Sequence, residues 1–570
     1  MLEEPLLATT SKGGVKTLPF IIANESFEKV ASYGLLPNMI TYLMGSYGMK
    51  LATGSNFIYY WSAATSLAPV LAAFLADSYV GRFWMIALGS IISFLGITLL
   101  WFTTIIPSAR PCDDSGTICT SPTIFQLTIL VSSFIIMSVG AGGIRSSSLA
   151  FGTDQLIKKK NVNHSGILER FFNWYYFATS VSVMIATTFV VYVQENFGWK
   201  LGFGVPVICM FLSAISFLLA SPLYIKLKAE AGSPVGFTQV FMASWKKRHF
   251  NVYESQDDQF LYFRRKGSRL IKPTHKLRFL NKACMIQNTE EELTLDGEIR
   301  DPWRLCTIEQ VEELKSLIKV LPIWSTGIIM STVTAQTPFK VLLIKTMNRH
   351  ITSNFQIPAG SFSTFTIISI ILWIAIYDLI IIPLASKLMR KPVKLNPRAR
   401  MGIGIILSFL SMVITSLVEG VRRETAIKEG FSDDTSGVTD MSALWLLPHH
   451  WFSGMAEAFY TIAQSEFFCS EFPRSMLSVA TNLHGVGMSL ASLIASFIFN
   501  TIDELSSNGG KESWVSSNIN RAHFDYYYWV LTGLCLVNCF YYFVCDKAYG
   551  PSSDEEQDKL LIDEGSVESR

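Results

Sequence analysis

The sequence predicts an all-α integral membrane protein whose chain crosses the bilayer twelve times, in two groups of six helices. Hydrophobic residues make up 50% of its 570 residues and charged residues only 16%, whereas a soluble protein carries about 25% charged residues. The mean hydropathy is positive, at +0.33. Twelve apolar runs are each long enough to cross about 30 Å of hydrocarbon, and a long polar stretch separates the sixth from the seventh. This composition excludes a disordered chain and disfavours a soluble enzyme.

The twelve runs differ in the residues that interrupt or bound them. The first contains three charged residues, the fourth ends in glycines followed by Arg145, and the tenth includes Glu457. The twelfth opens on the aromatic residues 526 to 529, as an interfacial aromatic belt would. The first run is too long and too polar for the apolar core of a cleavable signal peptide. In order, the predicted spans lie near residues 17 to 45, 56 to 78, 83 to 106, 124 to 144, 169 to 194, 202 to 224, 309 to 335, 360 to 385, 400 to 420, 441 to 467, 475 to 500 and 523 to 545.

The positive charges predict the orientation of the chain. Lys and Arg total 15 between residues 226 and 304, and further clusters lie at 158 to 160 and at 387 to 400. With twelve spans these segments share one side with both termini, and the positive-inside rule makes that side cytoplasmic. We expect the plasma membrane, with the vacuolar membrane as the alternative. The predicted divisions are a cytoplasmic tail (1–16), a six-helix bundle (17–224), a cytoplasmic linker (225–308), a second six-helix bundle (309–546) and an acidic cytoplasmic tail (547–570).

The cysteines and the linker carry weaker signals. Cys112 and Cys119 share a predicted exterior loop, where a disulfide is permitted. The other cysteines lack zinc-type spacing, so we predict neither a metal nor a cofactor. In the linker, residues 238 to 250 alternate apolar and basic side chains, which favours a helix lying along the membrane surface. A calmodulin-type target is the alternative.

Three charged residues stand inside the first predicted span. Glu25, Glu28 and Lys29 follow one another at i, i+3 and i+4, so they share one helical face. Glu25 can pair with Lys29, which leaves Glu28 as a carboxylate in a poorly solvated place. Desolvation favours its neutral form and the nearby ammonium favours its charged form, so such a group can take up and release a proton. Lys29 also offers a positive charge to an anionic solute. The alternative is a structural ion pair near the helix end.

The two halves also offer charges of opposite sign. The fourth span ends in glycines that permit close helix packing, and Arg145 follows them, whereas the tenth span contains Glu457. We predict that Arg145 and Glu457 can pair across a central cavity, and that a proton or a substrate releases them. The alternative for Arg145 is a boundary residue whose side chain reaches the membrane surface.

A series of motifs runs along most of the chain: NESFEK (24 to 29), LADSYVGR (75 to 82), GGIRSSSLAFGTDQL (142 to 156), FFNWYYF (171 to 177), GWKLGFGVP (198 to 206), FQIPAGSF (355 to 362) and EFFCSEFPRSM (466 to 476). These motifs, in this order, resemble the plant nitrate transporter 1 / peptide transporter family, a branch of the proton-dependent oligopeptide transporters in the major facilitator superfamily. The resemblance covers residues from about 17 to 550, and FIIANESFEKVASYGLLPNMI and DYYYWV resemble the first plant subfamily in particular.

This resemblance implies a major facilitator fold, in which two six-helix bundles surround a site that opens alternately to each side. It implies proton symport, with the family's E-x-x-E-[RK] motif at Glu25, Glu28 and Lys29. The resemblance also implies that Arg145 is the family's cation of the fourth helix and that Glu457 is its acid of the tenth helix. The resemblance also implies a cytoplasmic gating loop, at Asp77, Gly81 and Arg82.

The predicted function is a proton-coupled symporter of a small anionic or zwitterionic solute. The predicted partners are the solute, protons and the lipid bilayer; a net charge of +2 gives no reason to expect nucleic acid. Nitrate ranks first as substrate, then plant hormones or other carboxylates, then di- and tripeptides. The seventh span carries Thr334 and no histidine, so an anion must be held by other groups, Lys29 and Arg145 among them. The alternative is a transport-deficient receptor on the same fold; the linker holds no nucleotide loop or nucleophile arrangement typical of an enzyme.

Overall fold

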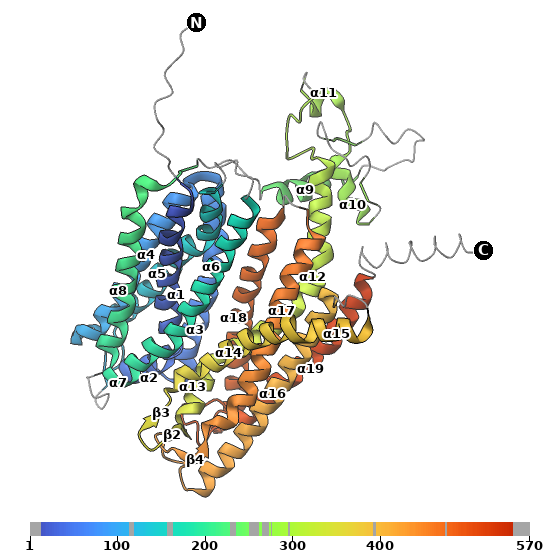
Figure 1. Ribbon diagram of the computed structural model, residues 1–570. Helices are drawn as coiled ribbons and strands as arrows, with labels where there is room; N and C mark the ends of the chain where they lie inside the picture. The colour runs from blue at the N-terminus through green and yellow to red at the C-terminus, as the bar shows by residue number, and fades with distance from the viewer. Residues whose placement is uncertain are drawn as a thin grey trace.

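The protein is built from two neighbouring groups of helices joined by a polar linker, as the ribbon of the computed structural model shows (Figure 1). The structure describes residues 13–112, 119–156, 164–227, 235–249, 262–264, 273–274, 276–294, 297–390, 395–473 and 476–550. Residues 1–12 of the predicted tail 1–16, residues 551–570 of the predicted tail 547–570, and the lysine cluster at 158–160 lie outside these residues. The end of the helix groups that carries Gly13, α9 and Tyr549 is called the linker side, and the opposite end the far side.

The first helix group runs from residue 15 to residue 223 and includes short irregular turns. Its helices are α1 (Leu18–Leu35), α2 (Met39–Tyr47), α3 (Leu51–Leu75), α4 (Arg82–Ile105), α5 (Ile124–Asp154), α6 (His164–Ile185), α7 (Val191–Phe197) and α8 (Trp199–Leu219). Single helical turns are η1 (Val15–Thr17), η2 (Ala76–Val80), η3 (Pro107–Ala109), η4 (Ala186–Val190) and η5 (Ser221–Leu223).

The linker and the second group follow. The linker contains α9 (Val235–Lys246), α10 (Arg278–Asn281), η7 (Lys282–Cys284) and α11 (Thr289–Glu292). The second group contains α12 (Ile308–Thr334), α13 (Thr337–Lys345), α14 (Ser363–Ile376), α15 (Ile382–Met389), α16 (Pro397–Lys428), α17 (Leu447–Glu471), α18 (Leu477–Ser507) and α19 (Phe524–Tyr549), with turns η8 (Ala359–Phe362), η9 (Tyr377–Ile381), η10 (Ala443–Leu446) and η12 (Asn508–Gly510). On the far side, strand β1 (Met347–Asn348) pairs in parallel with β4 (Thr439–Ser442), and β2 (His350–Thr352) pairs in antiparallel with β3 (Phe355–Gln356).

Ten helical segments in the described part of the chain are long and apolar enough to cross a membrane. They coincide with ten of the twelve predicted spans, and the two that are missing are 17 to 45 and 441 to 467. The first contains three charged residues, and the second contains two histidines and Glu457. These are the spans on which the functional prediction rests, so the count of twelve stays a prediction.

The first predicted span is divided in the structure. It forms α1 and α2, and the break falls at residues 36 to 38. Pro37 stands in this break. Because proline has no backbone N–H and disfavours helix in the preceding residue, an apolar run that reads as one helix is divided into two.

The linker helix α9 lies at the linker side end of α12. Its buried Val240 and Ala243 pack with Ile308 and Val311 of α12. The opposite surface exposes large side chains, among them Trp245. The predicted amphipathic segment therefore forms a helix with one packed and one exposed face.

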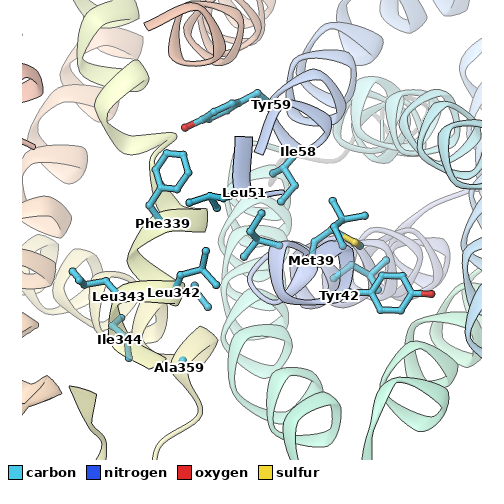
Figure 2. Close-up of a cluster of buried hydrophobic side chains, with 14 of the residues drawn as sticks. Met39, Tyr42, Leu51, Ile58, Tyr59, Phe339, Leu342, Leu343, Ile344 and Ala359 are labelled. Atoms are coloured by element: carbon cyan, nitrogen blue, oxygen red, sulfur yellow. The ribbon is translucent and has the colours of Figure 1, made fainter. Parts of the chain in front are cut away.

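The two helix groups are joined on the far side. Figure 2 shows Leu51 of α3 beside Phe339 and Leu342 of α13; Met39 and Tyr42 of α2 belong to the same buried apolar cluster but lie farther from α13. We call Leu51, Phe339 and Leu342 the far-side seal. They come from segments about 300 positions apart in the chain, so apolar burial across the boundary is what holds the groups together here.

Polar contacts reinforce the far-side seal. The Tyr59 hydroxyl donates to Oε1 of Gln336 at 2.7 Å, and Arg349 pairs with Glu195 at 2.5 Å. Within the described residues, the hydrogen bonds and ion pairs that join the two helix groups all lie on the far side. The conformation is therefore one that is closed at the far side.

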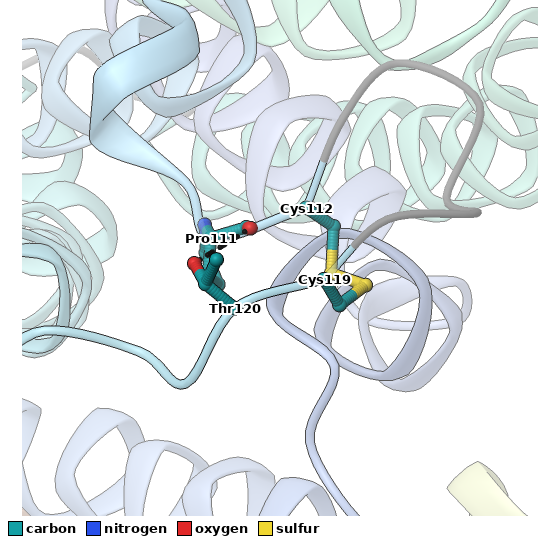
Figure 3. The surroundings of a disulfide bond; sticks show 4 residues. All are labelled: Pro111, Cys112, Cys119 and Thr120. Carbon is teal, nitrogen blue, oxygen red and sulfur yellow. Dashed lines mark hydrogen bonds between the residues drawn. A yellow bond between two sulfur atoms is a disulfide. The ribbon is translucent and has the colours of Figure 1, made fainter.

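The predicted disulfide also lies on the far side. Cys112 and Cys119 are bonded in the segment between α4 and α5. Figure 3 shows Thr120 beside this disulfide, with its backbone N–H donating to the carbonyl oxygen of Pro111 at 3.1 Å.

Candidate functional site

The charged face of α1 is fixed by polar contacts to two neighbouring helices. Asn24 is fully buried, and its amide donates to the Ser90 hydroxyl of α4 at 2.9 Å and the Ser213 hydroxyl of α8 at 2.8 Å. Ser213 returns a hydrogen bond to the backbone oxygen of Asn24 at 3.0 Å. Because these bonds set the rotation of α1 about its axis, they direct the next turn of the helix toward the interior of the first group.

Each acid on this face has its own cation. Glu25 pairs with Lys29 at 3.6 Å, as the i, i+4 spacing predicts. Glu28 pairs with Arg145 of α5: Nη2 lies 2.8 Å from Oε1, and Nε lies 3.1 Å from both carboxylate oxygens. The Ser32 hydroxyl donates a further hydrogen bond to Glu28 at 2.5 Å. The Glu28 side chain is fully buried, whereas that of Arg145 is 17% exposed, so only the cation of this pair reaches open space.

Glycines of α5 bring Arg145 within reach of α1. A Cβ on Gly140 would lie 2.3 Å from the backbone nitrogen of Ser93, and one on Gly143 would lie 2.9 Å from the carbonyl oxygen of Met85. A side chain at these positions would push α4 away from α5. The predicted close packing of this glycine run is therefore present, and it places Arg145 next to the charged face of α1.

An aromatic ring lies between the two cations. The Lys29 ammonium is 5.4 Å, and the Arg145 guanidinium 5.6 Å, from the centre of the Tyr33 ring. Such cation–π contacts favour the positive charge without neutralising it. Tyr33 is 38% exposed and lines the cavities described next.

Three cavities meet beside this charged group. Their volumes are about 320, 90 and 400 Å³, and Thr334 of α12 and Glu457 of α17 line all three. Arg145 lines the 320 Å³ cavity, together with residues of both helix groups. The two residues of the second group that the sequence singled out therefore stand at the junction of these spaces.

The structure does not join Arg145 to Glu457. Arg145 is bonded to Glu28, while Glu457 is exposed on the cavity wall and makes no hydrogen bond or ion pair within the described part of the chain. Arg145 pairs with Glu28 rather than with Glu457 because Glu28 belongs to the same helix group, in which α1 and α5 pack directly against each other. The Arg145–Glu457 bridge remains a prediction for another conformation.

The predicted gating loop forms a charge cluster on the linker side. Arg82 pairs with Asp77 at 3.1 Å and with Asp154 at 2.9 Å. Gly81 has a φ of 83°, which is unfavourable for residues with a side chain. The turn between α3 and α4 is thereby tied to the end of α5. Asp154 was missed as a partner, although it is part of the quoted motif GGIRSSSLAFGTDQL.

The lysine and the two histidines that line the 400 Å³ cavity were not predicted as site residues. They are Lys340 of α13 and His449 and His450 of α17. Lys340 follows the apolar run that ends near residue 335, and a lone histidine in a helix is usually a packing residue. Among the described residues, no three His, Cys, Asp or Glu side chains gather as a metal site.

Comparisons with known proteins place this geometry in context. The family model described as "POT family" matches residues 83–515. NRT1/PTR FAMILY 1.2 of Arabidopsis thaliana is 50% identical over 552 residues, which cover 96% of this chain and 91% of that protein. NRT1/PTR FAMILY 1.1 of the same plant is 48% identical and covers 97% and 94%.

Solved structures share the fold at low sequence identity. The crystal structure of an auto-inhibited POT family peptide transporter matches with a TM-score of 0.68 at 16% identity, covering 94% of this chain and 98% of that one. A POT family transporter in complex with 5-aminolevulinic acid matches with a TM-score of 0.60 at 14% identity, covering 95% and 99%. The fold of two helix groups is therefore the one found in these transporters.

Proposed function

This chain belongs to the POT family, and from this premise we propose that it is a proton-coupled symporter of a small anionic or zwitterionic solute. The observation that carries the proposal is the pair formed by Glu28 and Arg145. The acid is fully buried and the cation reaches the 320 Å³ cavity. A proton on Glu28 would remove the charge that holds Arg145, and the freed guanidinium would be available to an anion in the cavity.

Glu25 and Lys29 support the same chemistry one turn away. Their 3.6 Å contact is longer and looser than the Glu28–Arg145 contact, so protonation of Glu25 would release Lys29 at a smaller cost. Both cations lie against Tyr33, which would keep them near the cavity after release. We propose Glu25, Glu28 and Lys29 as the proton-coupling group, and Lys29, Arg145, Glu457 and Thr334 as the substrate-binding group.

The cavity acid supplies the link between the two halves. Once Glu28 is neutral, Glu457 is the next carboxylate that faces Arg145 across the 320 Å³ cavity. We propose that this attraction, or the substrate anion in its place, draws the helix groups together on the linker side. The far-side seal would then open as the groups rock about their interface.

We propose that the linker side is cytoplasmic, with both termini on that side, because the positive residues gather there. The cluster of Asp77, Gly81 and Arg82 would then be a cytoplasmic gate, tied to α5 through Asp154. We also propose the divisions 1–16, 17–224, 225–308, 309–546 and 547–570, and a place in the plasma membrane. Two buried carboxylate pairs are costly inside a membrane, and a receptor that transports nothing has no need of them.

For the substrate, we keep nitrate first, then plant hormones or other carboxylates, then di- and tripeptides. The test is expression in oocytes with external solution at about pH 5.5 or about pH 7.4, and addition of nitrate, a hormone acid or a dipeptide. An inward current that is stimulated by acid is expected for at least one of them. No acid-stimulated current from any of the three, by a protein that reaches the surface, would overturn the proposal.

A further inference from the structure

The 400 Å³ cavity contains a cation that the proposed mechanism does not use. Both helix groups supply residues to the lining of this cavity. Among the described lining residues, Lys340 of α13 is the only lysine or arginine. Lys340 makes no hydrogen bond or ion pair within the described part of the chain. Lys29 and Arg145, by contrast, are held by Glu25 and Glu28. In this conformation Lys340 is therefore the cavity cation that an incoming anion meets without a competitor.

The surroundings of Lys340 do not supply a counter-charge. The titratable groups near it are His449, His450 and Cys535, which carry no negative charge at neutral pH. His450 is hydrogen-bonded to Thr366 at 2.8 Å, and His449 to Ser411 and Thr415 at 2.7 Å each. Glu457 lines the same cavity, but no ion pair joins it to Lys340.

An unpaired ammonium in this position is costly. A charged side chain within the membrane is energetically costly and normally pairs with another group. A structural role for Lys340 would need a partner, and none is present among the described residues. A ligand that brings a negative charge would remove this cost, whereas a neutral ligand would not.

The rest of the cavity wall indicates what the anion is attached to. The wall is apolar over much of its surface, through Leu36 of the first group and Val341, Ile344, Ile367, Ile370 and Ile371 of the second. Hydroxyl groups of Thr334, Thr337 and Thr366 supply a few polar points. Sites of this kind, mostly apolar with a few convergent polar groups, bind organic molecules of moderate size.

We propose that Lys340 binds the anionic group of the transported solute. The apolar wall then favours the second-ranked substrate class over nitrate: an organic monoanion, such as a carboxylate, whose apolar body lies against this wall. This inference rests on the proposed function and names its substrate class. In this conformation it places the anion on α13 of the second group, next to the far-side seal, while Lys29 and Arg145 are still held by Glu25 and Glu28.

The test uses the full-length purified protein with phenylacetate, and with phenylacetamide as a neutral ligand of the same shape. Binding is followed by the rise in melting temperature. Wild type is expected to bind phenylacetate and not phenylacetamide. Lys340→Met should weaken phenylacetate binding at least about tenfold, because a charge-assisted contact is lost, and Lys340→Arg should retain it. Lys428→Gln, at an exposed lysine of α16, is the control and should bind like wild type.

Two results would overturn the inference: unchanged phenylacetate binding by Lys340→Met, or equal binding of acid and amide by wild type. If Lys340→Met does not fold, phenylacetate binding by Lys340→Gln, together with the comparison of acid and amide in wild type, tests the inference in its place. The two proposals fail separately. Phenylacetate binding through Lys340 without acid-driven current from any solute would overturn the symporter alone, and acid-driven carboxylate current that is the same in Lys340→Gln would overturn the Lys340 site alone.

Discussion

The pair of Arg349 and Glu195 gives a direct test of the far-side-closed conformation. Glu195 of α7 accepts from Arg349 at 2.5 Å and from the backbone N–H of Ala359 at 3.2 Å, so it joins the two helix groups twice. The Arg349 side chain is 12% exposed and the Glu195 side chain 23% exposed. A buried charge-assisted bond contributes about 1.5–3 kcal/mol, and partial solvation reduces this to about 1–2 kcal/mol. Glu195→Gln should therefore shift the balance toward the far-side-open state by about 5- to 30-fold.

This shift can be measured by cysteine labelling. Thr337→Cys, in a background with Cys469→Ser, places a thiol in the wall of the 320 and 400 Å³ cavities, behind the far-side seal. A membrane-impermeant maleimide added at the far side should label this thiol faster in the Glu195→Gln variant. Asp433→Asn is the control, because its exposed pair with Arg521 lies within one helix group. Equal labelling rates in Glu195→Gln and Asp433→Asn would refute the assignment of this pair to the gate.

Two predictions concern stability, and both are read from melting temperatures in detergent. Gly140→Ala should destabilise the protein by about 1–3 kcal/mol, because its Cβ would lie 2.3 Å from the backbone nitrogen of Ser93; Gly420→Ala, with nothing within 4 Å, is its control, and equal melting would contradict the packing argument. Glu419→Gln should cost about 3 kcal/mol, because it leaves the fully buried Arg422 uncompensated. Its control is Glu424→Gln on the same helix, where the pair with Lys428 is exposed, and the prediction fails if the two variants melt alike.

Local spacing predicted part of the site. The i, i+4 relation is a property of any helix, so the pair of Glu25 and Lys29 could be predicted from the sequence. The close packing of α5 could also be predicted from its glycines, because a residue without a Cβ lets a neighbouring helix approach closely.

Contacts between distant segments were not predictable in the same way. Glu28 and Arg145 are 117 positions apart, and one sequence does not say which acid of the interior takes the arginine. The sequence suggested Glu457, because opposite charges in the two halves fit a carrier that closes across its centre. In the far-side-closed conformation the acid of the same helix group is nearer. The sequence also could not place Lys340 on a cavity wall, because α13 lies after the predicted seventh span, which ends near residue 335.

The fold itself followed from the length of the apolar runs and from the polar stretch between the sixth and seventh of them, and the exceptions have physical causes. Two predicted spans are not apolar enough to be identified as membrane helices by composition alone. One contains Glu25, Glu28 and Lys29, and the other contains Glu457. Charged side chains lower the hydropathy of a helix, so composition alone does not identify these two helices as membrane spans. The break at Pro37 had a visible signal, the proline, which the length of the apolar run concealed.

We propose that a proton on Glu28 releases Arg145 and so couples proton entry to solute movement. The most direct measurement of this coupling uses proteoliposomes that contain wild type or Glu28→Gln, with the solute identified by the oocyte test. Glu28→Gln is expected still to exchange labelled for unlabelled solute across the membrane, while accumulation driven by a pH gradient is lost. Accumulation by Glu28→Gln at the wild-type rate and with the wild-type dependence on pH would contradict the proposed coupling.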